Sequence, residues 1–115
     1  MINKEKDIYD SLKYAGFYLT QAIYKAEKIG VDKLDDLIKK YTARMFNYIH
    51  NKRQVELLVY LEKIYASISL QPQKDIIEIL RVRQTRKFQK YALAFMMWFM
   101  SEPKKDNGKG GEYEQ

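Results

Sequence analysis

Hydrophobic positions recur with a helical period along most of the chain. Between residues 4 and 29, apolar side chains follow one another at alternating intervals of four and three residues, which places them on one face of a helix. The members of this stripe are Ile8, Leu12, Ala15, Leu19, Ala22, Ala26 and Ile29. Because three of them are alanines, we expect another helix to approach this face closely. Asn3 is suited to cap the start of the helix, and Gly30 to end it in a left-handed turn.

The same period predicts three or four further helices. Asp32 is a suitable N-cap for a second helix that runs to about His50, and Asn51 with Gln54 forms a capping-box pattern that opens a third. Pro72 suits the first position of a fourth helix. Residues 81–100 either extend that helix or form a fifth. The apolar positions expected on or beside the inward stripes are Leu34, Leu37, Ile38, Tyr41, Met45, Tyr48, Ile49, Leu57, Leu58, Leu61, Ile64, Tyr65, Ile68, Ile76, Ile77 and Leu80.

Strand signals are nearly absent, since the chain shows no sustained alternation of polar and apolar residues and few valines. Short connections between helices favour antiparallel neighbours. The pattern therefore predicts an all-α fold, an antiparallel bundle of four to five helices, with residues 1–102 forming one domain. Residues 103–115 are polar and glycine-rich, which predicts a disordered C-terminal tail.

Composition excludes several kinds of site. The chain has no cysteine and one histidine, so the usual thiolate and imidazole ligands of zinc and iron are missing, and we expect no metal and no other cofactor. The first residues lack the apolar core of a signal peptide. The longest apolar run, residues 91–100, is about half the length that a bilayer span needs. These features predict a cytoplasmic protein without a membrane segment.

Positive charge lies in two blocks. The chain has 21 Lys and Arg against 15 Asp and Glu, which gives a net charge of +6. The first block, residues 37–60, carries Lys39, Lys40, Arg44, Lys52 and Arg53 against Glu56. The second, residues 79–101, carries Arg81, Arg83, Arg86, Lys87 and Lys90 and no acidic residue. Such a surplus favours polyanionic partners.

The second block has the pattern of an amphipathic helix. On a helical wheel Arg83, Arg86, Lys87 and Lys90 share one side, opposite an aromatic side. Long cations on a rigid helix can neutralise successive phosphates without reading bases, so we interpret this face as a nucleic-acid contact. A plain solvated face and a contact with an acidic protein or a membrane surface are the alternatives. The candidate nucleic-acid-binding residues are Arg81, Arg83, Arg86, Lys87, Lys90, Lys40, Arg44, Lys52 and Arg53. The sequence leaves open whether the two blocks form one surface.

Arg44 and His50 suggest a different function, by their spacing. Their spacing resembles the short Arg-x5-His motif of the HEPN ribonucleases, small helical proteins in which these two residues act on the RNA phosphate. That family usually has a polar residue directly after the arginine, where this chain has Met45. No phosphate loop, paired inward carboxylates or nucleophile with a base is visible. We therefore expect a binding protein rather than an enzyme.

The last apolar run predicts a contact with another chain. Phe88, Ala92, Phe95 and Phe99 suffice to fill an inward face, which leaves further large apolar residues to be covered. These are Met96, Met97, Trp98 and Met100. Large exposed apolar patches tend to mark contact sites, so we expect self-association or a partner through this helix.

The basic bundle with an arginine- and aromatic-rich last helix resembles the small subunits of CRISPR interference complexes of the Cascade, Csm and Cmr kinds. The resemblance rests on Arg81, Arg83, Arg86, Lys87 and Lys90 followed by YALAFMMWF, and covers residues 4–101. It implies a non-catalytic subunit that holds the displaced DNA strand or the guide–target duplex by its backbone. It also implies stacked copies and contacts with other CRISPR subunits. A HEPN-like ribonuclease and a helical protein-binding adaptor remain the alternatives.

Overall fold

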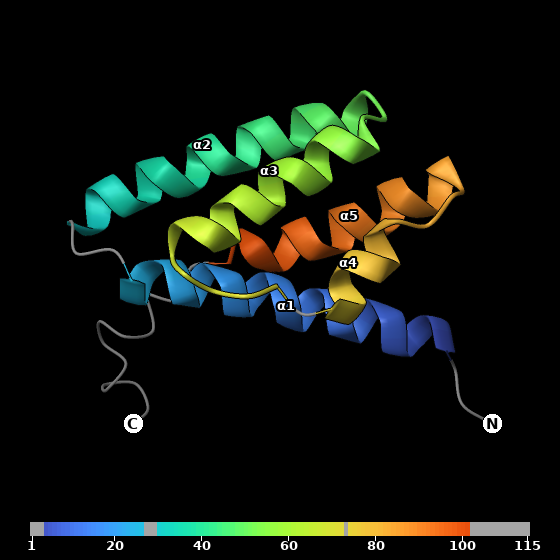
Figure 1. Cartoon of the computed structure of the whole chain (residues 1–115). Helices are drawn as coiled ribbons and strands as arrows, with labels where there is room; N and C mark the ends of the chain where they lie inside the picture. Colours follow the sequence, from blue (N-terminus) through green and yellow to red (C-terminus); the bar gives the residue numbers. More distant parts are fainter. Residues whose placement is uncertain (1–3, 27–29, 73, 102–115) are drawn as a thin grey trace.

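The computed structural model describes residues 4–26, 30–72 and 74–101, and this part of the chain folds into five helices without a strand (Figure 1). The all-α prediction is confirmed. The helices are α1 (Lys4–Ala26), α2 (Val31–His50), α3 (Gln54–Ser67), α4 (Lys74–Leu80) and α5 (Thr85–Phe99). The predicted cap at Asn3, the stripe member Ile29 and the predicted tail of residues 103–115 lie outside the described residues.

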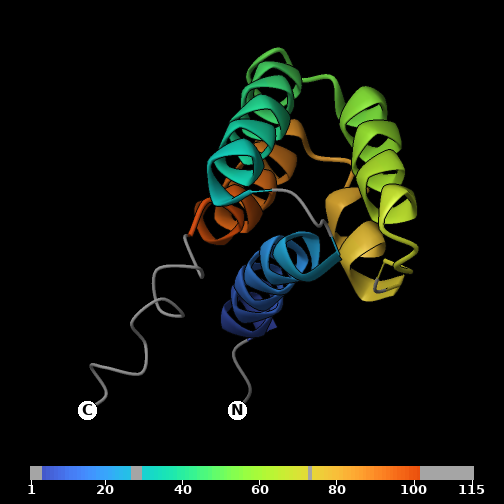
Figure 2. The same cartoon turned by 90° about the vertical axis from the view of Figure 1, so that its left-hand side faces the viewer.

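The helices are stacked one above another. The antiparallel pair α2 and α3 lies over α5 and α4, and α1 lies beneath them (Figures 1 and 2). By contrast, α1 and α5 run in the same direction. The ring centroids of Tyr9 and Tyr91 lie 5.5 Å apart and those of Phe17 and Trp98 lie 6.1 Å apart, so residue numbers increase together along both helices. The segment after α3 returns the chain to the far end of the molecule before α5 begins, which makes this parallel pairing possible.

The core is densest between α1 and α5. On α5 the predicted inward face is confirmed, because Phe88, Ala92, Phe95 and Phe99 are all buried. On α1 the predicted stripe holds only in its first part: Ala22 is half-buried and Ala26 is exposed. Helix α5 ends opposite Thr20, whose hydroxyl donates to the carbonyl oxygen of Phe99, so the end of α1 has no α5 to pack on. The buried residues of α1 are Leu12, Ala15, Gly16, Leu19, Thr20 and Ile23.

Two predicted helix ends are wrong. Gly30 is extended, with φ −64° and ψ 156°, and forms the N-cap of α2 rather than a left-handed end of α1. Asp32 therefore lies inside the first turn of α2, where its carboxylate faces the positive end of the helix dipole. The left-handed residues among those described are instead Lys52 (φ 58°) and Ser69 (φ 56°), one in each connection that flanks α3.

The capping box at Asn51 and Gln54 is also wrong. The side-chain amide of Asn51 donates back to the carbonyl oxygen of Asn47 at 2.9 Å, and α3 begins after Arg53 without a side-chain cap. The side-chain amide of Gln54 instead donates to backbone carbonyls in the segment after α4. Pro72 precedes α4 without being helical, and Gln73 lies outside the described residues.

The chain breaks between α4 and α5, which resolves the alternative left open for residues 81–100. Residues 81–84 are not helical, and α5 begins only at Thr85. Arg81 and Arg83 therefore lie in a turn, and only Arg86, Lys87 and Lys90 share the helix surface predicted for the whole block.

Candidate nucleic-acid interface

Two glutamine side chains bring the two basic blocks together. The Gln54 amide donates to the carbonyl oxygens of Leu80 at 2.6 Å and Val82 at 2.8 Å. The Gln89 amide donates to the carbonyl oxygen of Ile49 at 3.0 Å. In a continuous helix, those two carbonyls of residues 80 and 82 would accept backbone N–H groups four residues further on. Gln54 therefore stabilises the break before α5 and holds the turn that follows α4 against the turn that precedes α3.

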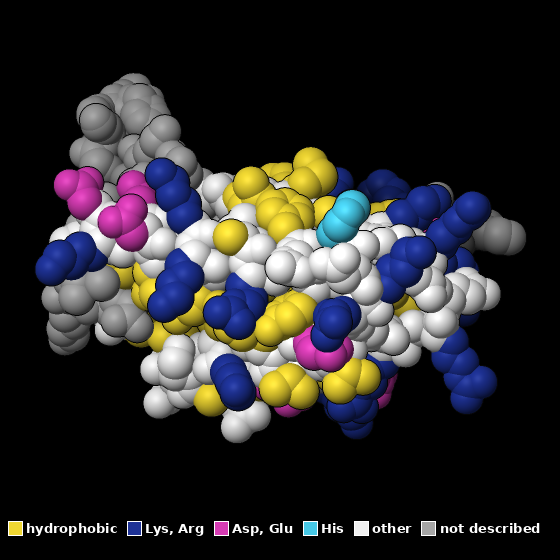
Figure 3. Space-filling view, turned by 90° about the horizontal axis from the view of Figure 1, so that it is seen from above, with side chains coloured by type: hydrophobic (Ala, Val, Ile, Leu, Met, Phe, Trp, Pro, Cys, Tyr) yellow, Lys and Arg dark blue, Asp and Glu magenta, His cyan; other side chains and the backbone are white. Residues whose placement is uncertain are grey.

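The result is a cluster of cations at one end of the bundle, which we call the basic end. In Figure 3 Lys and Arg side chains gather at this end of the molecule, and a group of Asp and Glu side chains lies at the opposite end. The opposite end is where α2 begins, with Asp32, Asp35 and Asp36 in its first two turns. The exposed side chains of the basic end are Lys52, Arg53, Arg81, Arg83, Arg86, Lys87 and Lys90.

One arginine of the basic end is already paired. Arg53 Nη1 lies 3.3 Å from the carboxylate of Glu56, and both side chains are exposed. An exposed pair of this kind contributes about 0–1 kcal/mol, so a phosphate can compete for the arginine. Helix α1 also begins near this end, since the ring of Tyr9 in its second turn lies 5.5 Å from that of Tyr91 in α5. Burial, together with the Glu5 carboxylate, raises the pKa of Tyr91.

Lys40 and Arg44 do not belong to the basic end. Both are exposed on α2, but Arg44 stands six residues before the end of that helix at His50, which corresponds to about 9 Å along its axis. The first sequence block is thus divided: Lys52 and Arg53 lie at the basic end, Arg44 faces α3, and Lys39 lines a cavity beside α1 and the end of α5.

Arg44 instead belongs to a group that we call the tyrosine cluster, formed by Arg44, Tyr41, Tyr48 and Tyr60. The guanidinium carbon of Arg44 lies 5.7 Å from the centroid of the Tyr60 ring. Tyr60 meets Tyr41 and Tyr48 edge to face, with centroids 6.1 Å and 5.9 Å away. Hydrogen bonding with Tyr48 raises the pKa of Arg44, and burial raises the pKa of Tyr60. Sequence reasoning missed Tyr60, because only the pairing of α2 with α3 brings it to Arg44.

His50 lies on a different side of α2 from Arg44. Together with Phe46, Ile49, Gln89 and Leu93 it lines a cavity of about 500 Å³ between α2 and α5. The guanidinium of Arg44 is turned toward α3, over Tyr60. Arg44 thus faces α3, whereas His50 borders the cavity against α5.

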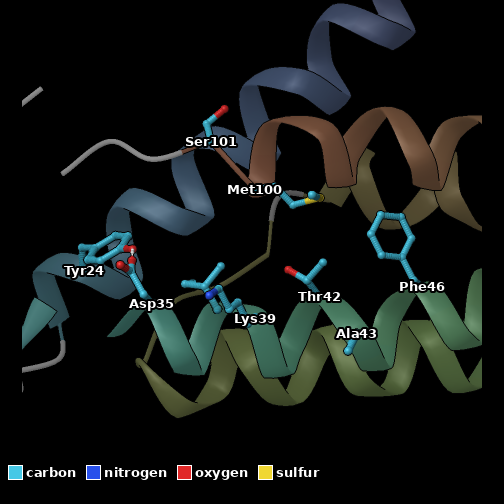
Figure 4. A pocket seen from close by; sticks show the side chains of 9 residues that line it. Tyr24, Asp35, Lys39, Thr42, Ala43, Phe46, Met100 and Ser101 are labelled. Atoms are coloured by element: carbon cyan, nitrogen blue, oxygen red, sulfur yellow. Dashed lines mark hydrogen bonds between the residues drawn. The ribbon is translucent and has the colours of Figure 1, made fainter. Parts of the chain in front are cut away.

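Apolar side chains continue from this cavity along α5. Leu93, Met97, Trp98 and Met100 are exposed, with Met97 at 67%, whereas Met96 is buried and needs no partner. A second cavity, of about 490 Å³, lies where α1, α2 and the end of α5 meet, and Phe46 and Met100 line it (Figure 4). At its edge the Tyr24 hydroxyl donates to Asp35 at 2.7 Å, as drawn in the same figure.

Comparisons with protein-family models, with curated proteins and with solved structures find no match for this chain. Within the described residues, no group of three or more His, Cys, Asp or Glu side chains is placed to hold a metal ion. None of the described helices is both long enough and apolar enough to cross a membrane.

Proposed function

We propose that the protein binds the phosphate backbone of nucleic acid through its basic end. The observation that carries the proposal is the pair of glutamine ties, Gln54 to residues 80 and 82 and Gln89 to residue 49, which assemble cations from two distant blocks into one surface. A backbone surface needs several exposed cations at spacings that match successive phosphates, and it needs no groups that read base edges. The basic end supplies seven exposed cations on two turns and the start of α5.

The proposed role is non-catalytic. The position of His50 beside α5 and of Arg44 beside α3 supports binding over the ribonuclease alternative, because general acid–base chemistry requires both groups within hydrogen-bond reach of one phosphate.

We place this binding within a CRISPR effector complex in the cytoplasm, where the protein acts as a small subunit on the guide–target duplex or the displaced strand. This part of the proposal rests on the resemblance of the arginine- and aromatic-rich residues 81–99 alone. Affinity purification of the native chain is expected to recover other CRISPR subunits and a guide RNA. Recovery of a complex without nucleic acid favours the protein-binding adaptor.

Two variants with the same change in net charge test the binding surface. In the first, Arg83, Arg86, Lys87 and Lys90 at the basic end become Gln. In the second, four exposed lysines elsewhere, Lys33, Lys39, Lys63 and Lys74, become Gln. We expect the first variant to weaken binding of a fluorescent oligonucleotide at least about tenfold, and the second to weaken it much less. Each phosphate contact that is removed also removes the favourable release of a counterion from the strand. Equal losses would show that net charge, and not the basic end, determines binding.

A further inference from the structure

The tyrosine cluster has the chemistry of a base-stacking platform. A planar guanidinium lies over one aromatic ring, and two further rings surround that ring. Unpaired bases stack on such groups, on arginine planes as well as on aromatic faces. We propose that Arg44, lying on Tyr60, is a stacking site for one unpaired base, so that the protein's ligand is single-stranded nucleic acid. This inference rests on the proposed function and names the form of nucleic acid that the protein takes.

The rings of the tyrosine cluster pack against one another. Tyr60 is half-buried and held edge to face by Tyr41 on one side and Tyr48 on the other. Aromatic rings prefer edge-to-face packing to a face-to-face sandwich, so these contacts stabilise the position of the Tyr60 ring. The guanidinium carbon of Arg44 lies 5.7 Å from the centroid of this ring. A base that stacks here therefore meets a rigid surface, and binding orders few side chains.

One face of the guanidinium remains available. Arg44 is exposed, although its guanidinium lies over the ring of Tyr60. A guanidinium is flat, delocalised and weakly hydrated, so a base can stack on the face that is turned away from the ring. In the view of Figure 3, Lys and Arg side chains lie among hydrophobic ones on the upper face of the molecule, and single-strand binding surfaces likewise combine cations with aromatic groups.

The distance to the basic end suits a continuous strand. Six residues of α2 follow Arg44 before the helix ends at His50, a rise of about 9 Å, and Lys52 lies in the turn just beyond. At the phosphate spacing of a duplex strand this is about three nucleotides, and fewer when the strand is extended. Lys40 lies one turn beyond Arg44 on the same face. A strand held by phosphates at the basic end can thus place one base on the cluster.

A duplex does not expose the face of any base to this site. Its bases are stacked on each other, and only their edges are open in the grooves. The cluster presents faces of planar groups, and base faces become free only when a strand is unpaired. The stacking site therefore separates single-stranded from double-stranded ligands, whereas the basic end alone holds either.

An abasic strand isolates the contribution of stacking. The intact full chain is titrated with a fluorescent 12-residue oligothymidine and with an abasic strand that has the same number of phosphates. We expect the wild-type chain to bind the thymidine strand at least about tenfold more tightly. In Arg44→Lys, which keeps the positive charge and loses the plane, this ratio is expected to fall to about threefold or less. Because Arg44 is exposed, we expect the substitution to leave the helices folded, and circular dichroism checks this.

Tyr60→Leu is expected to lower the ratio as well, and Tyr14→Leu, at an exposed tyrosine of α1, to retain it. Equal binding of both strands by the wild-type chain overturns the stacking site and leaves the basic end in place. An unchanged ratio in Arg44→Lys also overturns it. If neither strand binds, the proposed function fails and the stacking site fails with it.

Discussion

Gly16 of α1 lies directly against the backbone of Phe95 in α5. A Cβ atom on residue 16 would overlap the carbonyl oxygen of Phe95 and would lie 2.9 Å from the backbone nitrogen of Phe99. Backbone atoms inside a helix cannot move aside as a flexible side chain can. The close approach of α1 and α5 thus depends on the missing side chain at this position.

We predict that Gly16→Ala destabilises the fold by about 1–3 kcal/mol or more, because the two helices must separate to admit a methyl group. Gly30→Ala is the matched control. A Cβ atom there meets no described atom within 4 Å, and the φ of −64° suits alanine. Its expected effect is within about 1 kcal/mol. Urea denaturation followed by circular dichroism measures both, and equal effects of the two substitutions would contradict the close packing.

The sequence predicts the fold class but not this contact. The heptad stripe marks Leu12, Ala15 and Leu19 correctly, since any helix in a bundle buries its apolar positions. It assigns the close approach to Ala15, Ala22 and Ala26, of which only Ala15 is buried, and it leaves out Gly16. Periodicity shows which face of a helix is buried and not where the partner helix crosses it. The crossing is set by α5, which ends opposite Thr20.

The basic end illustrates the same limit. Charge counting identifies its cations correctly as exposed, but it cannot show that residues 52–53 and 81–90 meet. That proximity depends on Gln54, which the sequence pattern assigns to a helix cap because a glutamine three residues after an asparagine usually fills that role. Arg44 and Tyr60 lie on different helices, so no local pattern relates them either.

Gln54 is predicted to support both stability and binding. Gln54→Ala removes two hydrogen bonds and leaves the carbonyls of residues 80 and 82 without them, which should cost about 1–3 kcal/mol. Oligonucleotide affinity should fall as well, although no charge is lost. Gln84→Ala, at an exposed position whose side chain makes no cap hydrogen bond, is the control and should change stability by about 0.5 kcal/mol or less. Unchanged stability of the first variant would show that the ties are dispensable.

The exposed apolar side chains of α5 predict self-association. Met97→Gln should weaken it several-fold, because interface energy concentrates in large buried side chains. Val55→Gln on α3 replaces a residue that is equally exposed, at 69%, and should have no effect. Sedimentation equilibrium over a range of concentrations measures both. A wild-type chain that stays monomeric at the highest concentration would refute the prediction.

The buried hydroxyl of Tyr65 is expected to make the fold less stable at alkaline pH. Its side chain is 2% exposed, its hydroxyl has no hydrogen-bond partner among the described residues, and burial raises its pKa to about 12. The pKa of a tyrosine in the unfolded chain is about 10. The contribution of the neutral Tyr65 hydroxyl to the free energy of unfolding is therefore complete below pH 10, and it is lost as the pH rises toward 12. Between pH 9 and 11, the wild-type chain should lose about 1 kcal/mol more than Tyr65→Phe.

Tyr14→Phe, at an exposed hydroxyl, is the control for Tyr65 and should retain the wild-type loss. Denaturation at the two pH values measures the difference for all three chains. A Tyr65→Phe chain that loses as much stability as the wild type would show that the Tyr65 hydroxyl ionises freely in the folded state.

The salt dependence of oligonucleotide binding tests the basic end most directly. Each neutralised phosphate of a bound strand contributes about 0.7–0.9 to the slope of log K against log salt concentration. If Arg83, Arg86, Lys87 and Lys90 each contact one phosphate, replacing all four with Gln lowers the magnitude of that slope by about 3 to 4. A slope that stays at the wild-type value in this variant would contradict the account, because the strand would then lie on another surface.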